Sequence, residues 1–166
     1  MVRSLEKEAA EEGTTVNADV NSIVSRHFNW DKKVEEFGFV VVPMLAFTRL
    51  IESVDDETIA STGREVVPSL FEEMAELWFQ DSAPEKILDA VIMRFKFDTH
   101  IRARVTREGD AYTFIMHHDL GPKWSLFWEN GARGIVERFF HVEPRTTRGE
   151  SVVTASFKVN PKNLPT

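Results

Sequence analysis

The sequence predicts an α+β protein, in which an N-terminal helical region is followed by a ββαββ antiparallel-sheet domain. Up to about residue 93, apolar residues recur every three or four positions, which is the helical period. From Phe95 the period changes to two, and two more strand-like runs follow an intervening helix that begins at a proline. We therefore expect three regions: a helical hairpin over 1–36, a mainly helical part over 37–93, and the ββαββ domain over 94–166.

Amphipathic stripes and capping residues predict the helices before the sheet. The expected helices cover 4–12, 16–30, 44–54, 65–79 and a stretch that opens at Pro84. Gly13 suits the end of the first helix, because glycine tolerates the left-handed conformation found there. Pro68 is compatible with its helix only in the first turn. A short strand is expected over 37–42, which is β-rich and stopped by Pro43.

The first hairpin of the domain is expected to turn at Glu108-Gly109 and to end near His118. With this turn, Ile101 lies opposite Met116 and one face of the hairpin is entirely apolar. A shift of one residue would mix apolar and polar side chains on both faces, so this register is favoured. His118 falls on the apolar face, and we expect its side chain to be buried and hydrogen-bonded.

The same register gathers titratable side chains on the polar face. His100 stands opposite His117, with Cβ atoms about 5 Å apart. Asp98 and Asp119 lie one step further toward the open end of the hairpin. Imidazoles and carboxylates suit Zn²⁺ or another borderline cation, so these four residues form a candidate metal site. The alternative is a solvated sheet face on which polar residues simply alternate outward.

A small anionic ligand is a second hypothesis for this end of the hairpin. Pro122 suits the first position of a helix, whose free backbone N–H groups would point toward the end of the preceding strand. The candidate ligand-binding residues are His100, Arg102, Arg104, His117, Asp119, Lys123, Trp124 and Ser125. A second hairpin, with strands over 138–145 and 151–159 and with Phe140 opposite Phe157, would complete the sheet.

Charge and composition limit the function classes. The net charge of -7 is uneven: residues 37–93 carry -8, whereas residues 94–166 carry +4 and hold four of the five histidines. The two parts either complement each other or leave the basic end for an anion or nucleic acid. No cysteine is present, which excludes disulfides and thiolate chemistry. No apolar run approaches the roughly 20 residues of a membrane span, and no signal peptide is recognisable, so a cytoplasmic protein without membrane contact is expected.

Residues 4–24 resemble the two helices of ribbon-helix-helix DNA-binding proteins of the Arc, MetJ and CopG type. The shared pattern is a Leu-x-x-x-Ala helix at Leu5, a turn containing Gly13, and an Asn-x-x-Val helix at Asn17. The resemblance implies a homodimer held by these helices. Such proteins read DNA with a strand that precedes the first helix. Here only three residues precede Ser4, so that strand is expected to be absent or truncated, and Arg3 is the single candidate for a DNA contact.

The leading hypothesis is therefore a dimeric, transcription-regulator-like protein with a C-terminal domain that senses or binds a ligand. Residues 118–127 also resemble a stretch in uncharacterised archaeal proteins with such an N-terminus, which implies no activity. The alternative is a small-ligand or metal-binding module without a nucleic-acid role. A metal-dependent hydrolase ranks third, because no phosphate loop, His-Glu-x-x-His motif or Gly-x-Ser-x-Gly elbow is present, and an enzyme is not expected.

Overall fold

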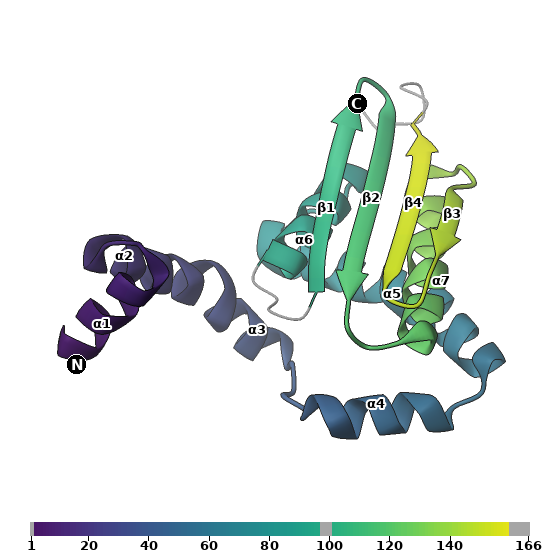
Figure 1. Ribbon diagram of the computed structural model, residues 1–166. Helices are drawn as coiled ribbons and strands as arrows, with labels where there is room; N and C mark the ends of the chain where they lie inside the picture. Colours follow the sequence, from purple (N-terminus) through teal and green to yellow (C-terminus); the bar gives the residue numbers. More distant parts are fainter. Residues whose placement is uncertain (1, 97–100, 160–166) are drawn as a thin grey trace. The chain divides into compact units, whose positions relative to one another are not determined.

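The computed structural model describes residues 2–96 and 101–159 and divides the chain into two compact units (Figure 1). Unit 1 is Met1–Val40 and unit 2 is Val41–Thr166. Almost all of the region expected to be mainly helical, residues 37–93, therefore shares a unit with the sheet domain. The α+β class is confirmed, with helices preceding an antiparallel sheet along the chain.

Unit 1 consists of helices. These are α1 (Val2–Glu12), α2 (Val16–Arg26), the π-helical turn η1 (His27–Asp31) and α3 (Lys32–Phe37). Gly13, with φ +68°, separates the first two helices, and the Thr15 hydroxyl caps α2 by accepting a hydrogen bond from the Ala18 N–H at 3.2 Å. Gly38, at φ +81°, then ends α3.

The strand expected over 37–42 is wrong. Phe37 is the last residue of α3, and residues 39–43 have no regular secondary structure. Val41 is fully exposed and Val40 is 81 % exposed. A β-rich run becomes a strand only where a neighbouring strand takes up its backbone hydrogen bonds, and no described strand pairs with this one.

Three helices open unit 2: α4 (Met44–Ser53), α5 (Asp56–Phe79) and α6 (Pro84–Lys96). Helix α5 begins nine residues before the expected start, because Asp55 caps it. The Asp55 carboxylate accepts hydrogen bonds from the Thr58 N–H and hydroxyl, each at 2.8 Å. These bonds stabilise the ionised carboxylate and hold the pKa of Asp55 below its usual value.

Pro68 lies in the middle of α5, which overturns the expectation that it must occupy a first turn. Proline has no N–H to donate to the carbonyl of Arg64, four residues earlier. Gly134 of the neighbouring helix packs against this point. A Cβ atom there would stand 2.5 Å from the Arg64 oxygen and 2.7 Å from Pro68 Cγ. Tight packing against a glycine thus accommodates the interruption within a buried interface.

The remaining elements confirm the ββαββ order. They are β1 (Ile101–Glu108), β2 (Ala111–His118), α7 (Pro122–Phe140), β3 (Arg145–Arg148) and β4 (Val152–Lys158). The four strands form one antiparallel sheet with the order β1-β2-β4-β3. The second hairpin thus lies beside the first through β4, and β1 and β3 are the two edges.

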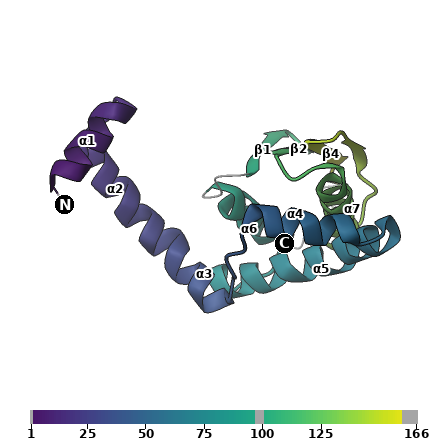
Figure 2. The same ribbon diagram turned by 60° about the horizontal axis from the view of Figure 1, so that its bottom comes forward.

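Unit 2 has three layers (Figures 1 and 2). Helices α6 and α7 lie on one face of the sheet, and α5 packs against both from the outside. An aromatic group joins the layers: the ring of Phe95 lies 6.3 Å from Phe71, 5.1 Å from Trp128 and 6.0 Å from Phe114. None of the described helices of this unit lies on the opposite face of the sheet. Within the described residues, no helix is both long and apolar enough to cross a membrane.

The register of the first hairpin differs from the expected one by two residues. Arg102, not His100, stands opposite His117, and Ala103, not Ile101, stands opposite Met116. The turn is Gly109-Asp110, with Gly109 at φ +65°. A two-residue hairpin turn favours glycine at a position with positive φ, which moves the turn one residue further along the chain. Because the shift is even, every side chain keeps its expected face.

The second hairpin starts later than expected. Residues 138–140 belong to α7, which ends where His141 adopts the left-handed conformation at φ +54°. Strand β3 covers only residues 145–148. Phe140 does meet Phe157, with ring centroids 5.0 Å apart, but it does so from the helix across the core. Phe139 and Phe140 belong to the last turn of α7 and pack into the core, so the helix continues through residues whose composition also suits a strand.

Candidate functional site

The structure describes two of the four residues expected to bind a metal. His117 is exposed at the end of β2 opposite Arg102, and Asp119 is exposed just after this strand. The other two members of the set, Asp98 and His100, lie outside the described residues. Over residues 2–96 and 101–159, no group of three or more histidine, aspartate or glutamate side chains is placed to hold a metal ion.

His118 is buried and hydrogen-bonded, as expected from its place on the apolar face. Its side chain is 2 % exposed and Ser125 is fully buried. His118 Nδ1 accepts a hydrogen bond from the Leu120 N–H at 3.2 Å. His118 Nε2 therefore carries the proton of the neutral ring and donates to Ser125 Oγ at 2.9 Å. Ser125 in turn donates to the Glu150 carbonyl at 3.2 Å.

This chain of hydrogen bonds holds together three segments of unit 2. It joins the end of β2, the first turn of α7 and the loop before β4. Burial lowers the pKa of His118, the Asp119 carboxylate opposes that change, and His117 adds to it. A nucleophilic serine needs a histidine nitrogen that accepts its proton, whereas this nitrogen donates to the serine. The pair is thus arranged as a structural link.

Lys123, proposed for an anion site at the start of α7, makes its contacts within the protein. Its ammonium donates to the carbonyl oxygens of Glu52, at 3.1 Å, and Val54. The Asp56 carboxylate stands 3.7 Å away. Backbone carbonyls at a helix end lack intrahelical partners, and here the lysine satisfies them. This side chain ties α7 to the connection between α4 and α5.

Trp124, another expected ligand-binding residue, lies in an aromatic cluster. Its ring stacks on Phe127 at a centroid distance of 4.8 Å and meets the edge of Phe47 at 5.0 Å. Trp128 completes the cluster at 5.8 Å. Phe47 is half-buried on α4, so these contacts attach α4 to α7. Residues 123–125 therefore connect α7 to neighbouring helices and to the sheet, Lys123 and Ser125 through hydrogen bonds and Trp124 through ring contacts.

Arg102 and Arg104 lie together on the uncovered face of the sheet, as expected. Alternation along the paired strands adds residues that the sequence did not single out, namely Arg145 on β3 and Lys158 on β4. We call this surface the open face. Its members on the four strands are Arg102, Arg104, Thr106, Glu108, Ala111, Thr113, Ile115, His117, Arg145, Thr147, Val152, Thr154, Ser156 and Lys158. His141 lies outside this face, because it is the C-cap residue of α7.

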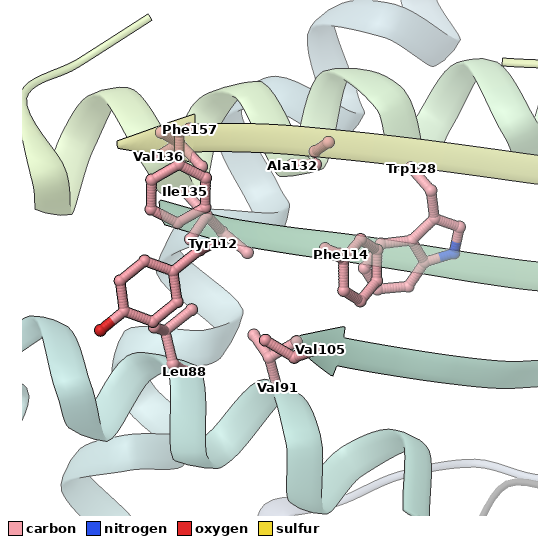
Figure 3. Close-up of a pocket in the computed structure, with 11 residues that line it drawn as sticks. Leu88, Val91, Val105, Tyr112, Phe114, Trp128, Ala132, Ile135, Val136 and Phe157 are labelled. Carbon is pink, nitrogen blue, oxygen red and sulfur yellow. The ribbon is translucent and has the colours of Figure 1, made fainter. Parts of the chain in front are cut away.

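Unit 2 also contains a small apolar cavity between the sheet and the helices (Figure 3). It has a volume of about 40 Å³ and is lined by α6, α7 and the inner face of three strands. The indole nitrogen of Trp128 and the hydroxyl of Tyr112 point away from the other lining side chains. Pockets that enclose drug-sized ligands measure roughly 300–1,000 Å³. The cavity is therefore a packing gap in the core, and we do not place a ligand in it.

Unit 1 leaves an apolar stripe uncovered. Val20, Ile23, Val24 and Phe28 follow one another at helical spacing along α2 and η1, and Ile23 and Phe28 are 56 % and 59 % exposed. No residue of α2 is buried. The described part of unit 1 buries only two hydrophobic side chains, Ala9 and Trp30. Arg3, the residue considered for a DNA contact, lies in α1, which begins at Val2.

Comparison with known proteins adds no family to these observations. No family model matches the chain, and neither the curated proteins nor the solved structures gave a significant match.

Proposed function

We propose that this protein is a regulator-like homodimer, in which unit 1 mediates association and unit 2 binds a ligand through its sheet. The observation that carries this proposal is the uncovered apolar stripe of α2 and η1. The helix that carries it has no buried residue, so little of its apolar surface is removed from water by unit 1 itself. A second copy could remove it by packing the same stripe against itself.

Physical estimates support helix pairing through this stripe. Complete burial of a valine, isoleucine or phenylalanine side chain contributes roughly 1.5–3 kcal/mol. In a twofold-symmetric dimer each residue contributes from both copies, so the four stripe residues place eight apolar side chains in the interface. The resemblance to ribbon-helix-helix proteins, which dimerise through the corresponding helices, supports the same arrangement. Transcription regulation is the role that this resemblance suggests.

The open face of the sheet is the surface of unit 2 that we propose for ligand binding. It brings together cations and hydroxyl groups and is not covered by the helices of its own unit. The cavity behind the sheet is too small to serve, and the His118–Ser125 pair and Lys123 are already engaged in structural contacts. A small anion or a larger anionic partner fits the chemistry of this face.

The size of the whole chain in solution tests the proposal. We expect a dimer by analytical ultracentrifugation across a dilution series. Ile23→Glu places a charge in the apolar stripe and should raise the dimer Kd at least about 100-fold, corresponding to roughly 3 kcal/mol. Ser22→Glu adds the same charge at an exposed position off the stripe and should leave the dimer intact. A wild-type protein that stays monomeric, or equal weakening by both variants, would refute it.

A further inference from the structure

The open face of the sheet has an excess of positive charge. Arg102 and Arg104 on β1, Arg145 on β3 and Lys158 on β4 are all exposed there, and among the described strand residues of this face the one acid is Glu108. This local excess stands within a protein whose net charge is -7. The excess of basic over acidic residues in the C-terminal sequence is thus concentrated on one surface.

These four cations have no anionic partner among the residues that the structure describes. Several arginines on the helical side of the sheet behave differently. Arg64 pairs with Glu137, Arg138 pairs with Glu72, and Glu129 takes both Arg133 and Arg148. These arginines are thus neutralised by acids of the same unit, whereas those of the open face are available to an external anion.

Short hydroxyl side chains fill the space between the cations. Pairing across the strands brings Thr113 next to Ser156, and Thr147 next to Thr154. Hydroxyl groups of this kind, together with arginine and lysine, are common donors to phosphate oxygens. On its described strands, the larger apolar side chains of the face are Ile115 and Val152, and no phenylalanine, tyrosine or tryptophan ring lies there.

The spacing of the cations suits an extended anion better than a compact one. Arg102 and Arg104 are two residues apart on one strand, or about 7 Å between Cα atoms. Arg145 lies on the opposite edge strand, three strand spacings away, or about 14 Å from β1. A single phosphate or carboxylate can reach one or two of these groups. A chain of phosphates can reach all of them.

Composition favours nucleic acid over protein as the partner. The centre of a protein interface is depleted in charged residues and enriched in aromatic ones, and the open face has neither property. A second copy presenting the same face would bring like charges together. Interfaces with nucleic acid are polar and strongly positive. Without phenylalanine, tyrosine or tryptophan rings, the face offers few surfaces for stacking on unpaired bases, so the phosphate backbone of a duplex is the better match.

We infer that the open face of the β1-β2-β4-β3 sheet binds the phosphate backbone of duplex nucleic acid without reading its sequence. The inference rests on the proposed function for the role of unit 2 as the binding unit, but it does not require the dimer. Arg102, Arg104, Arg145 and Lys158 contact phosphates, and the hydroxyl groups between them donate further hydrogen bonds. The open face is a different surface from the one that the ribbon-helix-helix resemblance implies, where a strand before the first helix contacts DNA.

Fluorescence anisotropy with a short labelled DNA duplex and the whole chain tests this assignment. Four phosphate contacts predict a slope of about -3.6 for log K against log salt concentration, so affinity should fall roughly 100-fold between about 50 and about 200 mM salt. The Arg102→Ala, Arg104→Ala, Arg145→Ala triple variant should reduce the slope to about -0.9. Each single substitution should reduce it by about 0.9, which keeps the test decisive if the triple variant folds poorly.

A triple variant with the same change in net charge provides the control. Arg26→Ala, Arg49→Ala and Lys86→Ala remove three cations, two exposed and one half-buried, that belong to helices and not to the sheet, and the slope should stay near that of the wild type. The inference is overturned if the wild type shows no salt-sensitive binding at about 50 mM salt, or if the control loses as much. It is also overturned if polyglutamate competes as well as the duplex at equal charge.

The dimer and the binding surface can fail separately. Ile23→Glu leaves the open face unchanged, so a monomeric variant should keep the salt slope per chain while its affinity for a long duplex falls. A protein that binds the duplex as a monomer would refute the proposed dimer and retain the sheet assignment. A dimer without duplex binding would do the reverse.

Discussion

The two units of this protein use their apolar residues in opposite ways. In unit 2, Phe71 is fully buried between α5, α6 and α7, and its ring lies near those of Phe95 and Trp128. In unit 1, Phe28 is 59 % exposed, although it belongs to an equally regular helical stripe. Both stripes have the period that marks an amphipathic helix. The contrast teaches that periodicity identifies a helix face that needs a packing partner, but not where that partner lies. For unit 2 the partner lies in the same chain, and for unit 1 we propose that it lies in a second copy.

Truncation of the two phenylalanines tests this contrast most strongly. Phe71→Ala removes a fully buried aromatic ring and should lower the free energy of unfolding by about 3–5 kcal/mol. Phe28→Ala should change the unfolding of unit 2 by less than about 0.5 kcal/mol and should instead weaken association. Chemical denaturation followed by near-ultraviolet circular dichroism, together with sedimentation, separates the two effects. A large loss of unit 2 stability in Phe28→Ala would remove the distinction between the units.

The closeness of α5 and α7 gives a second test, confined to the packed unit. A Cβ atom at Gly63 would stand 2.2 Å from the Phe127 carbonyl oxygen, which belongs to helix backbone and cannot rotate away. Gly63→Ala should therefore destabilise unit 2 by about 2–3 kcal/mol, even though alanine favours a helix by up to about 1 kcal/mol. Ser61→Ala, at an exposed position of the same helix, is the control. Unchanged or raised stability of Gly63→Ala by thermal unfolding would contradict this packing.

The buried histidine of unit 2 should make stability depend on pH, and this is the smallest of the three effects. Burial lowers the pKa of His118 in the folded state below the unfolded value of about 6.5. The unfolded chain then binds more protons near and below that value, so this contribution to stability is complete above a pH of about 6.5 and declines as the pH falls toward the folded pKa. One proton contributes at most about 1.4 kcal/mol per pH unit.

Substitution identifies the source of that slope. A glutamine side chain cannot be protonated in this range, so His118→Gln should flatten the dependence of unfolding free energy on pH between about 7 and 5. The exposed His27 of unit 1 provides the control, and His27→Gln should keep the slope of the wild type. Equal slopes in the wild type and in His118→Gln would show that the buried ring is not the group responsible.

Much of the fold could be predicted because its determinants are local. Pro84 and Pro122 fix the starts of α6 and α7, since proline suits a first helical turn. The faces of the first hairpin follow from strict alternation, so His118 was correctly assigned to the core. Prediction was less successful where a boundary depends on neighbours. Helix α5 continues through Pro68, beside which Gly134 of α7 packs closely.

The candidate site shows the same division. Alternation alone placed Arg102 and Arg104 on one surface, but the contribution of Arg145 and Lys158 to it depends on the strand order β1-β2-β4-β3. Lys123 has the sequence setting of an anion site, yet its ammonium contacts the carbonyls of Glu52 and Val54, 71 and 69 positions earlier in the chain. No local pattern reveals a contact of that separation.

By itself, the sequence determined which side chains share a face, because helical and strand periods are properties of neighbouring residues. The tertiary structure decided which residues face each other across strands and which cations remain without a partner in the described chain. His117 meets Arg102 because the turn falls at Gly109-Asp110, where a positive φ at glycine sets the register. A register shift of two residues leaves every side chain on the same face of the sheet, but it changes every cross-strand pair.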